Sequence, residues 1–273
     1  MAKNAYIGVS NVARKVKQPY IGVSNVARKV KNGYIGVSNV ARQFYQSGTP
    51  VSTLAVGSSV WMNVSGVATE FLVVHQGNPD TGIYDSSCNG TWLLMKNIYE
   101  TRRVHSSSTI VMFYANTEIN TYLNSTMLGL FDNSIQSLIK QVKIPYNGHT
   151  ATGTANAVAY TGTNGTPVKL FLLSIYEYGH ETTSTIKQEG AKLSYFLSGK
   201  DESSANAKRI AYYNGAASLY WTRSRNYQGQ HLGIMKTGAA TYANAATNAV
   251  GIRPALILPS TALVNDSGFV IAS

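Results

Sequence analysis

The chain has 273 residues, of which 44% are apolar and 13% are charged, and its formal net charge is +11. The single cysteine, Cys88, excludes an internal disulfide framework, and no stretch approaches the roughly 18 apolar residues of a membrane-spanning helix. The opening segment MAKNAYIGVS has no apolar run after its lysine, so we expect no secretory signal, synthesis in the cytoplasm and no insertion into a membrane.

The positive charge is concentrated at one end of the chain. Residues 1–50 contain eight Lys and Arg and no acidic residue, whereas residues 51–273 contain 15 basic and 12 acidic residues, a balance of +3. The basic character therefore belongs mainly to the first fifty residues.

Three nearly identical units of fourteen residues make up this basic segment, and they begin at Tyr6, Tyr20 and Tyr34 with the motif YIGVSNVAR. Apolar and other residues alternate around Ser10–Asn11, which predicts two short strands joined by a tight turn. Because a lone hairpin is marginally stable in water, we expect the repeats to stack or to wrap with sister chains. The prediction is an oligomerising β-prism or β-solenoid stalk over residues 1–48, as a homotrimer.

The basic repeats allow an alternative interpretation, an arm that binds nucleic acid or an anionic surface. The Lys and Arg residues recur in register with Val and Ile instead of clustering in a disordered run. We therefore favour a solvated face of a structural stalk, with no nucleic-acid partner.

The second predicted domain, residues 49–273, follows a junction at 46–58 and shows strand patterns, then two helix patterns, then further strand patterns. A cap at Thr117 and another at Asp132 should open its two helices, and Pro254 should place the last strand at a sheet edge or a bulge. This order predicts an α+β domain with one sheet and segregated helices. Strands are expected within 60–78 (two, joined near Ser65–Gly66), at 91–99, 168–179 (turning into a short helix), 218–224 and 250–258, and helices at 117–131 and 132–142.

Three motifs carry a resemblance to a known family: FLLSIYEYG (171–179), YWTRS (220–224) and VGIRPALIL (250–258). Together with the paired helices they resemble an uncharacterised domain family with a C-type lectin fold. That family is distantly similar to formylglycine-generating enzymes and is common in gut bacteria and their phages. The resemblance covers about residues 55–260 and implies a C-type lectin fold for the head.

Some members of that family are variable proteins of diversity-generating retroelements, in which adenines of one gene segment are rewritten. The resemblance implies such a segment at about 212–249, rich in the Asn, Tyr, Thr, Ser, Ala and Gly that mutated Asn codons yield. Trp221, Arg223, Arg253 and Leu256 would then form the fixed scaffold. The displayed, ligand-binding side chains would be Thr222, Arg225, Asn226, Tyr227, Gln228, Gln230, His231, Tyr242 and Asn244. A plain polar surface loop is the alternative for this segment.

Candidate catalytic and metal sites are weak in this sequence. The resemblance to formylglycine-generating enzymes would require two active-site cysteines, and Cys88 alone predicts a turn residue or a partly buried thiol. The segment GNPD (77–80) predicts a plain turn and not a calcium loop, and TGTNGTP (161–167) a flexible turn. The five histidines show no metal-binding spacing, and His180–Glu181 is the one neighbouring acid–base pair.

These observations predict a non-enzymatic protein without a cofactor or a metal ion. We expect a receptor-binding protein on a phage particle that recognises a protein or glycan on a host cell. The alternatives left open are an enzyme related to formylglycine generators and an undiversified structural adhesin with the same fold.

Overall fold

The computed structural model shows a mostly β protein, with 41% of residues in strands and 18% in helices. The expected fold class, an α+β C-type lectin head behind a β-prism or β-solenoid stalk, is therefore wrong. The strands are short and pair locally into several small sheets, and the described part of the chain forms no closed barrel or solenoid. The structure describes residues 6–9, 12–15, 19–23, 26–30, 32–37, 40–106, 113–149, 157–180, 188–197, 207–225, 231–244 and 246–271.

Each fourteen-residue repeat forms one antiparallel β-hairpin, as the alternation predicts. In the first hairpin Tyr6 lies opposite Lys15 and Val9 opposite Val12, and the second hairpin repeats this register. Each hairpin is a separate two-stranded sheet, so the described strands of the repeats form no common sheet. The strands are β1 (Tyr6–Val9), β2 (Val12–Lys15), β3 (Tyr20–Val23), β4 (Val26–Lys29), β5 (Asn32–Val37) and β6 (Val40–Gln46).

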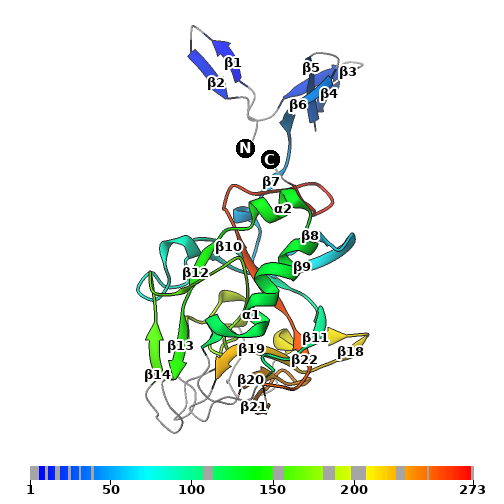
Figure 1. Cartoon of the computed structure of the whole chain (residues 1–273). Helices are drawn as coiled ribbons and strands as arrows, with labels where there is room; N and C mark the ends of the chain where they lie inside the picture. Colours follow the sequence, from blue (N-terminus) through cyan, green and yellow to red (C-terminus); the bar gives the residue numbers. More distant parts are fainter. Residues whose placement is uncertain are drawn as a thin grey trace.

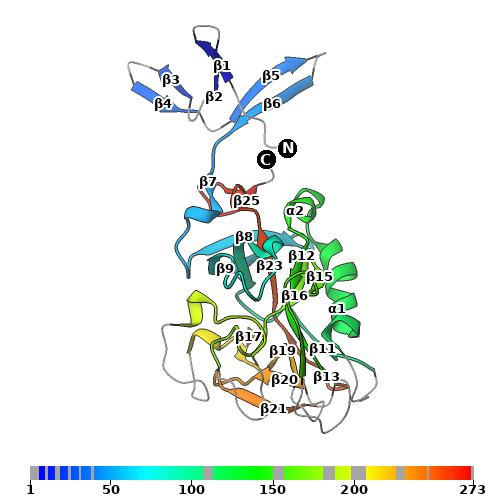
Figure 2. The same ribbon diagram turned by 90° about the vertical axis from the view of Figure 1, so that its left-hand side faces the viewer.

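The hairpins lie together at one end of the molecule, and the chain runs from β6 into the larger body (Figures 1 and 2). Tyr20 is 61% exposed, Ile21 56% and Tyr34 58%. Because successive side chains of a strand point to opposite faces, Tyr20 and Ile21 expose apolar surface on both faces of the second hairpin.

The first sheet of the larger body has the strand order β16-β23-β10-β9-β8 and is antiparallel throughout. The predicted turn at Ser65–Gly66 is confirmed: both residues have positive φ, 53° and 77°, as a two-residue hairpin turn requires. Every residue of the central strand β10 is buried. The strands are β8 (Ser59–Val64), β9 (Val67–Gly77), β10 (Gly90–Met95), β16 (Leu170–Leu172) and β23 (Pro254–Leu258).

The second sheet, β11-β22-β19-β20-β21, contains one parallel pair, β19 with β22. The predicted strand 250–258 divides at Arg253, so its first half joins the second sheet and its second half the first. Pro254 opens β23, which lies between β16 and β10, so the expected edge position is wrong. A proline is tolerated there because it is the first residue of the strand. The strands are β11 (Glu100–Arg102), β19 (Tyr220–Arg225), β20 (His231–Ile234), β21 (Ala240–Asn244) and β22 (Val250–Ile252).

The helical segments lie along one side of the larger body (Figure 2). The Thr117 cap is confirmed, because its hydroxyl accepts the backbone N–H of Asn120 at 3.2 Å. The first predicted helix is divided into an α-helical, a π-helical and a 3-10 segment, and the Asn124 side chain in the π-helical segment bonds the backbone of Leu170 in β16. Asp132 occupies the N-cap position of the second helix, as predicted, but its side chain makes no cap hydrogen bond, and the helix ends at Leu138 instead of at 142. The segments are α1 (Glu118–Tyr122), the π-helical η4 (Leu123–Met127), the 3-10 turn η5 (Leu128–Leu130) and α2 (Asn133–Leu138).

Short strands and turns complete the described structure. A tight turn follows β16 where a short helix was expected. The remaining strands are β7 (Thr49–Pro50), β12 (Val142–Ile144), β13 (Tyr146–His149), β14 (Ala157–Tyr160), β15 (Thr166–Val168), β17 (Tyr212–Tyr213), β18 (Ala216–Ala217), β24 (Leu263–Val264) and β25 (Val270–Ile271). The remaining 3-10 turns are η1 (Val51–Thr53), η2 (Ser86–Cys88), η3 (Tyr114–Asn116), η6 (Ser194–Phe196) and η7 (Ala207–Arg209).

Candidate functional site

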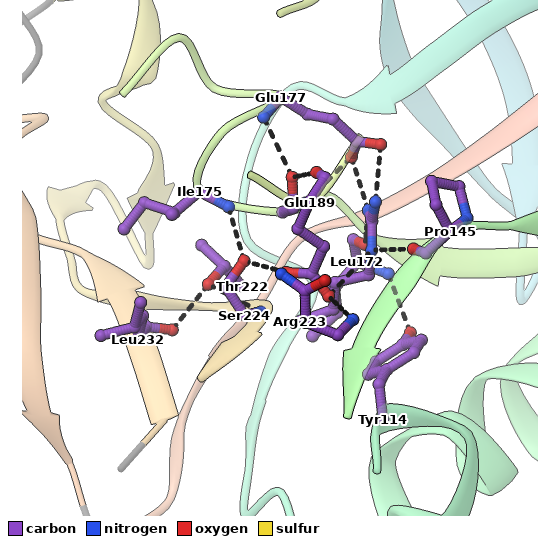
Figure 3. A network of polar contacts seen from close by, with 12 residues as sticks. Tyr114, Pro145, Leu172, Ile175, Glu177, Glu189, Thr222, Arg223, Ser224 and Leu232 are labelled. Atoms are coloured by element: carbon purple, nitrogen blue, oxygen red, sulfur yellow. Dashed lines mark hydrogen bonds and ion pairs between the residues drawn. The ribbon is translucent and has the colours of Figure 1, made fainter. Parts of the chain in front are cut away.

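A buried cluster of charged side chains lies between the two sheets, centred on Arg223 of β19 (Figure 3). Its guanidinium group forms a two-pronged ion pair with Glu177, at 2.5 Å from Nη1 to Oε2 and 2.7 Å from Nη2 to Oε1. Nε donates to the carbonyl of Pro145 and Nη1 also donates to that of Leu172, each at 3.0 Å. Both ion-paired side chains are fully buried.

Glu177 comes from the turn after β16, and its carboxylate is surrounded by donors. Besides Arg223, the Tyr84 hydroxyl donates to Oε1 at 2.6 Å and the Ser174 backbone N–H to Oε2 at 2.9 Å. Burial would lower the pKa of Arg223, but the charge of Glu177 and its hydrogen bonds outweigh this and raise it. Burial, followed by the Glu177 charge, raises the pKa of Tyr84 well above its usual value. Arg223 is therefore charged and Tyr84 is neutral at physiological pH.

A second carboxyl group, Glu189, borders the same cluster. Its Oε1 lies 3.8 Å from Arg223 Nε and accepts the Asn147 backbone N–H at 3.1 Å, and the Ser224 hydroxyl donates to Oε2. Burial raises the pKa of Glu189, although Arg223, Ser224 and Asn147 oppose the shift. One arginine thus faces two buried carboxyl groups.

This cluster joins segments that are distant in the sequence. Ser224 Oγ accepts the Ile175 backbone N–H at 3.0 Å, and the Thr222 hydroxyl donates to the Leu232 carbonyl at 2.8 Å (Figure 3). Tyr114 accepts the Leu172 N–H at 3.0 Å. Because these groups are buried and bonded to one another, the cluster orients β19 and the turn after β16 rather than binding a solute.

The structure places the expected scaffold residues in the core: Trp221 is 0% exposed, Arg223 2%, Arg253 1% and Leu256 1%. Arg253 donates from Nε to the Met95 carbonyl at 2.8 Å, where the chain crosses between the sheets.

Three residues expected on a displayed face, Thr222, Arg225 and His231, are instead buried, at 1%, 8% and 2% exposure. They lie in β19 and β20, which are interior strands of the second sheet, and this position corrects the expectation of display. Burial lowers the pKa of Arg225 to about 10 and, with the nearby charges of Arg225 and His105, that of His231 to about 3. Tyr242 and Asn244 belong to β21, but their side chains lie outside the described part of the structure. Asn226, Tyr227, Gln228 and Gln230 lie wholly outside the described residues.

The structure also shows the surroundings of three other candidates from the sequence: Cys88, the turn at 77–80 and His180. Cys88 is buried in a turn, as predicted, its thiol contacts the Lys143 carbonyl at 3.3 Å, and burial raises its pKa to about 12. Asn78 and Asp80 cap their own turn, which confirms the plain turn at 77–80. His180 is buried with its pKa lowered to about 3 by burial and by the charges of Arg209 and Lys192, while Glu181 lies outside the described residues.

Sequence reasoning missed the partners of Arg223 and one serine–histidine contact. The signal for Glu177 was a single acid within the apolar run 171–179, which indicates a buried ion pair. His75 Nδ1 lies 2.8 Å from the Ser194 hydroxyl and 3.3 Å from the Ser194 backbone nitrogen, so the ring caps the η6 turn. Their separation of 119 residues leaves no sequence signal.

Across the residues that the structure describes, no three His, Cys, Asp or Glu side chains form a group that could hold a metal ion. None of the described helices is both long and apolar enough to span a membrane.

Comparison with known proteins adds one finding. A family model described as a domain of unknown function, DUF6273, matches residues 89–260, which include both sheets' central strands and, apart from Tyr84, the Arg223 cluster. No curated protein and no solved structure match the chain. With more than half of its length covered by that model, the chain belongs to the DUF6273 family.

Proposed function

We propose that the protein is a non-enzymatic receptor-binding protein that works as a homo-oligomer, joined through the hairpins of residues 1–48. The observation that carries this proposal is the repetition of one hairpin with apolar side chains exposed on its faces. Tyr20, Ile21 and Tyr34 are each more than half exposed, and a two-stranded hairpin is marginally stable alone. Packing against the hairpins of other copies would cover these side chains, and edge-to-edge pairing of the strands would extend the sheets.

The larger body supports a binding role through its rigidity. The buried Arg223–Glu177 pair fixes β19 to the turn after β16 at a distance of 46 residues in the sequence. A framework held in this way suits non-covalent recognition, because little order is lost when a ligand binds. Several bodies on one oligomer would bind a cell surface more tightly than one body does. A phage particle is the setting that the family resemblance suggests for such an assembly.

A sedimentation assay tests the receptor-binding role. Labelled full-length protein is mixed with whole bacterial cells, Gram-positive and Gram-negative, and bound protein is measured after pelleting. We expect saturable binding to at least one cell type, with cells and protein recovered unchanged. The full-length variant Tyr20→Ser/Ile21→Ser/Tyr34→Ser should bind more weakly because avidity is lost, while the control Leu197→Ser, at a residue 58% exposed in the larger body, should bind normally. If the protein binds none of the cell types saturably, the proposal is contradicted.

The basic hairpins favour one alternative function, binding of nucleic acid through the eight Lys and Arg of residues 1–50. The same assay distinguishes it. If nuclease treatment abolishes the binding, the hairpins bind nucleic acid.

A further inference from the structure

A groove of about 460 Å³ lies beside the β8–β9 hairpin and the segment that follows β10. Its volume is in the range of small-ligand sites, which is roughly 300–1,000 Å³. It is separate from the Arg223 cluster and from the segment expected to vary. The residues that line it include Trp61, Ala68, Glu70, Lys96, Asn97 and Tyr99, and Ala68 is exposed.

An aromatic side chain is held in place on one wall of this groove. Trp61 is partly exposed, and its ring lies against Phe269 with centroids 6.4 Å apart. Its backbone N–H donates to the Gly268 carbonyl at 2.9 Å, so the C-terminal turn fixes the strand at this residue. Tyr99 adds a second, partly buried ring, and its backbone N–H donates to Ile252 at 2.9 Å. The groove therefore has a preformed apolar surface for a flat ligand.

The polar part of the groove is an ion pair. Lys96 Nζ lies 2.9 Å and 3.1 Å from the two oxygens of Glu70, and the Ser59 hydroxyl also donates to Glu70. The side chain of Lys96 is 48% exposed and that of Glu70 19%. Asn97, the next residue, also lines the groove and is exposed. Donors and acceptors thus lie next to one another with no net charge.

We infer that this groove binds a neutral sugar unit of a cell-surface glycan. One face of a pyranose ring is apolar and can lie on Trp61, while its hydroxyl groups both donate and accept hydrogen bonds, as the carboxylate, ammonium and amide of the groove require. Because the Glu70–Lys96 pair carries no net charge, it gives no net electrostatic attraction to a charged ligand, which favours a neutral one. This inference rests on the proposed receptor-binding role and names its ligand class.

Tryptophan fluorescence of the full-length protein tests the inference. The other two tryptophans, Trp92 and Trp221, are 0% exposed, so quenching by acrylamide reports on Trp61. The probes are glucose, galactose, mannose and N-acetylglucosamine and their short oligosaccharides. We expect at least one of them to protect Trp61 from acrylamide and to bind with a measurable Kd.

Three variants test the site. Ala68→Arg adds a long charged side chain at an exposed residue that lines the groove, and we expect its Kd for the bound oligosaccharide to rise at least about tenfold. Val56→Arg adds the same charge at a residue 39% exposed that does not line the groove, and its Kd should stay unchanged. Trp61→Ala should also weaken binding, and circular dichroism establishes whether it folds.

Each result has a distinct meaning. Sugar binding that survives in Ala68→Arg overturns the groove as the site and leaves the receptor-binding role intact. Absence of sugar binding, while cells are still bound, overturns the ligand class alone. Absence of both overturns the inference together with the proposed function.

Discussion

Acidification should destabilise the protein because two neutral histidine rings are buried next to positive charges. His180 and His231 are each 2% exposed, and each has its pKa lowered from 6.5 to about 3. Burial is the main cause for both rings. Arg209 and Lys192 add to the shift at His180, and Arg225 and His105 at His231.

The sign and size of the effect follow from proton linkage. Above pH 6.5 both rings are neutral in the folded and unfolded states, so they cause no difference. As the pH falls from 6.5 towards 3, the unfolded chain takes up protons that the folded protein does not, and stability is lost. At pH 5 the loss is about 2 kcal/mol for each ring, and about 4 kcal/mol for both, against a typical total of about 5–15 kcal/mol.

Urea denaturation at pH 7.5 and pH 5.0 measures this loss. Because other buried groups such as Glu189 also titrate in this range, the double variant His180→Gln/His231→Gln isolates the histidines. Between the two pH values, the wild-type free energy of unfolding should fall by about 4 kcal/mol more than that of the double variant, whose side chains carry no proton to gain. An equal pH-dependent change in both proteins would refute the reasoning.

Further predictions concern the buried polar groups. Arg223→Met leaves two carboxyl groups without their cation and should cost about 3–5 kcal/mol in urea denaturation, whereas Arg103→Met, which breaks an exposed pair with Glu118, should cost far less; similar losses would contradict the role of the cluster. The pKa of Glu189 is raised above the ordinary glutamate value of 4.5, so wild-type stability should fall as the pH rises above about 4.5. Glu189→Gln should therefore gain stability relative to the wild type as the pH rises from about 4 to about 7. A stability difference that stays constant over that range would show that Glu189 stays ionised. The Cys88 thiol, with a pKa of about 12, should not react with a thiol reagent at pH 8 until urea unfolds the protein, and rapid reaction of the native protein would contradict its burial.

Local patterns in the sequence predicted local structure well. The three hairpins, the β8–β9 turn at Ser65–Gly66 and the Thr117 cap each depend on neighbouring residues, so their signals lie within a few positions. Cys88 and the turn at 77–80 were predicted for the same reason.

Features that depend on distant partners were predicted wrongly or missed. The segment YWTRSR suggests a half-exposed strand because Thr222 and Arg225 are polar. In the structure both side chains are buried, and their strand, β19, lies in the interior of the second sheet. Arg223 finds its carboxylate 46 residues away, and the two halves of 250–258 join different sheets at Arg253. No short window of sequence contains these contacts. The groove at Trp61 brings together two segments and was equally invisible.

The central claim is that the hairpins of residues 1–48 join copies of the chain, and light scattering of the full-length protein tests it most directly. The account predicts a mass near three times the 29.4 kDa of one chain, and a shift towards one chain in Tyr20→Ser/Ile21→Ser/Tyr34→Ser but not in Leu197→Ser. A mass of 29.4 kDa for the wild type at all concentrations, or an oligomer that the triple substitution leaves unchanged, would contradict the account.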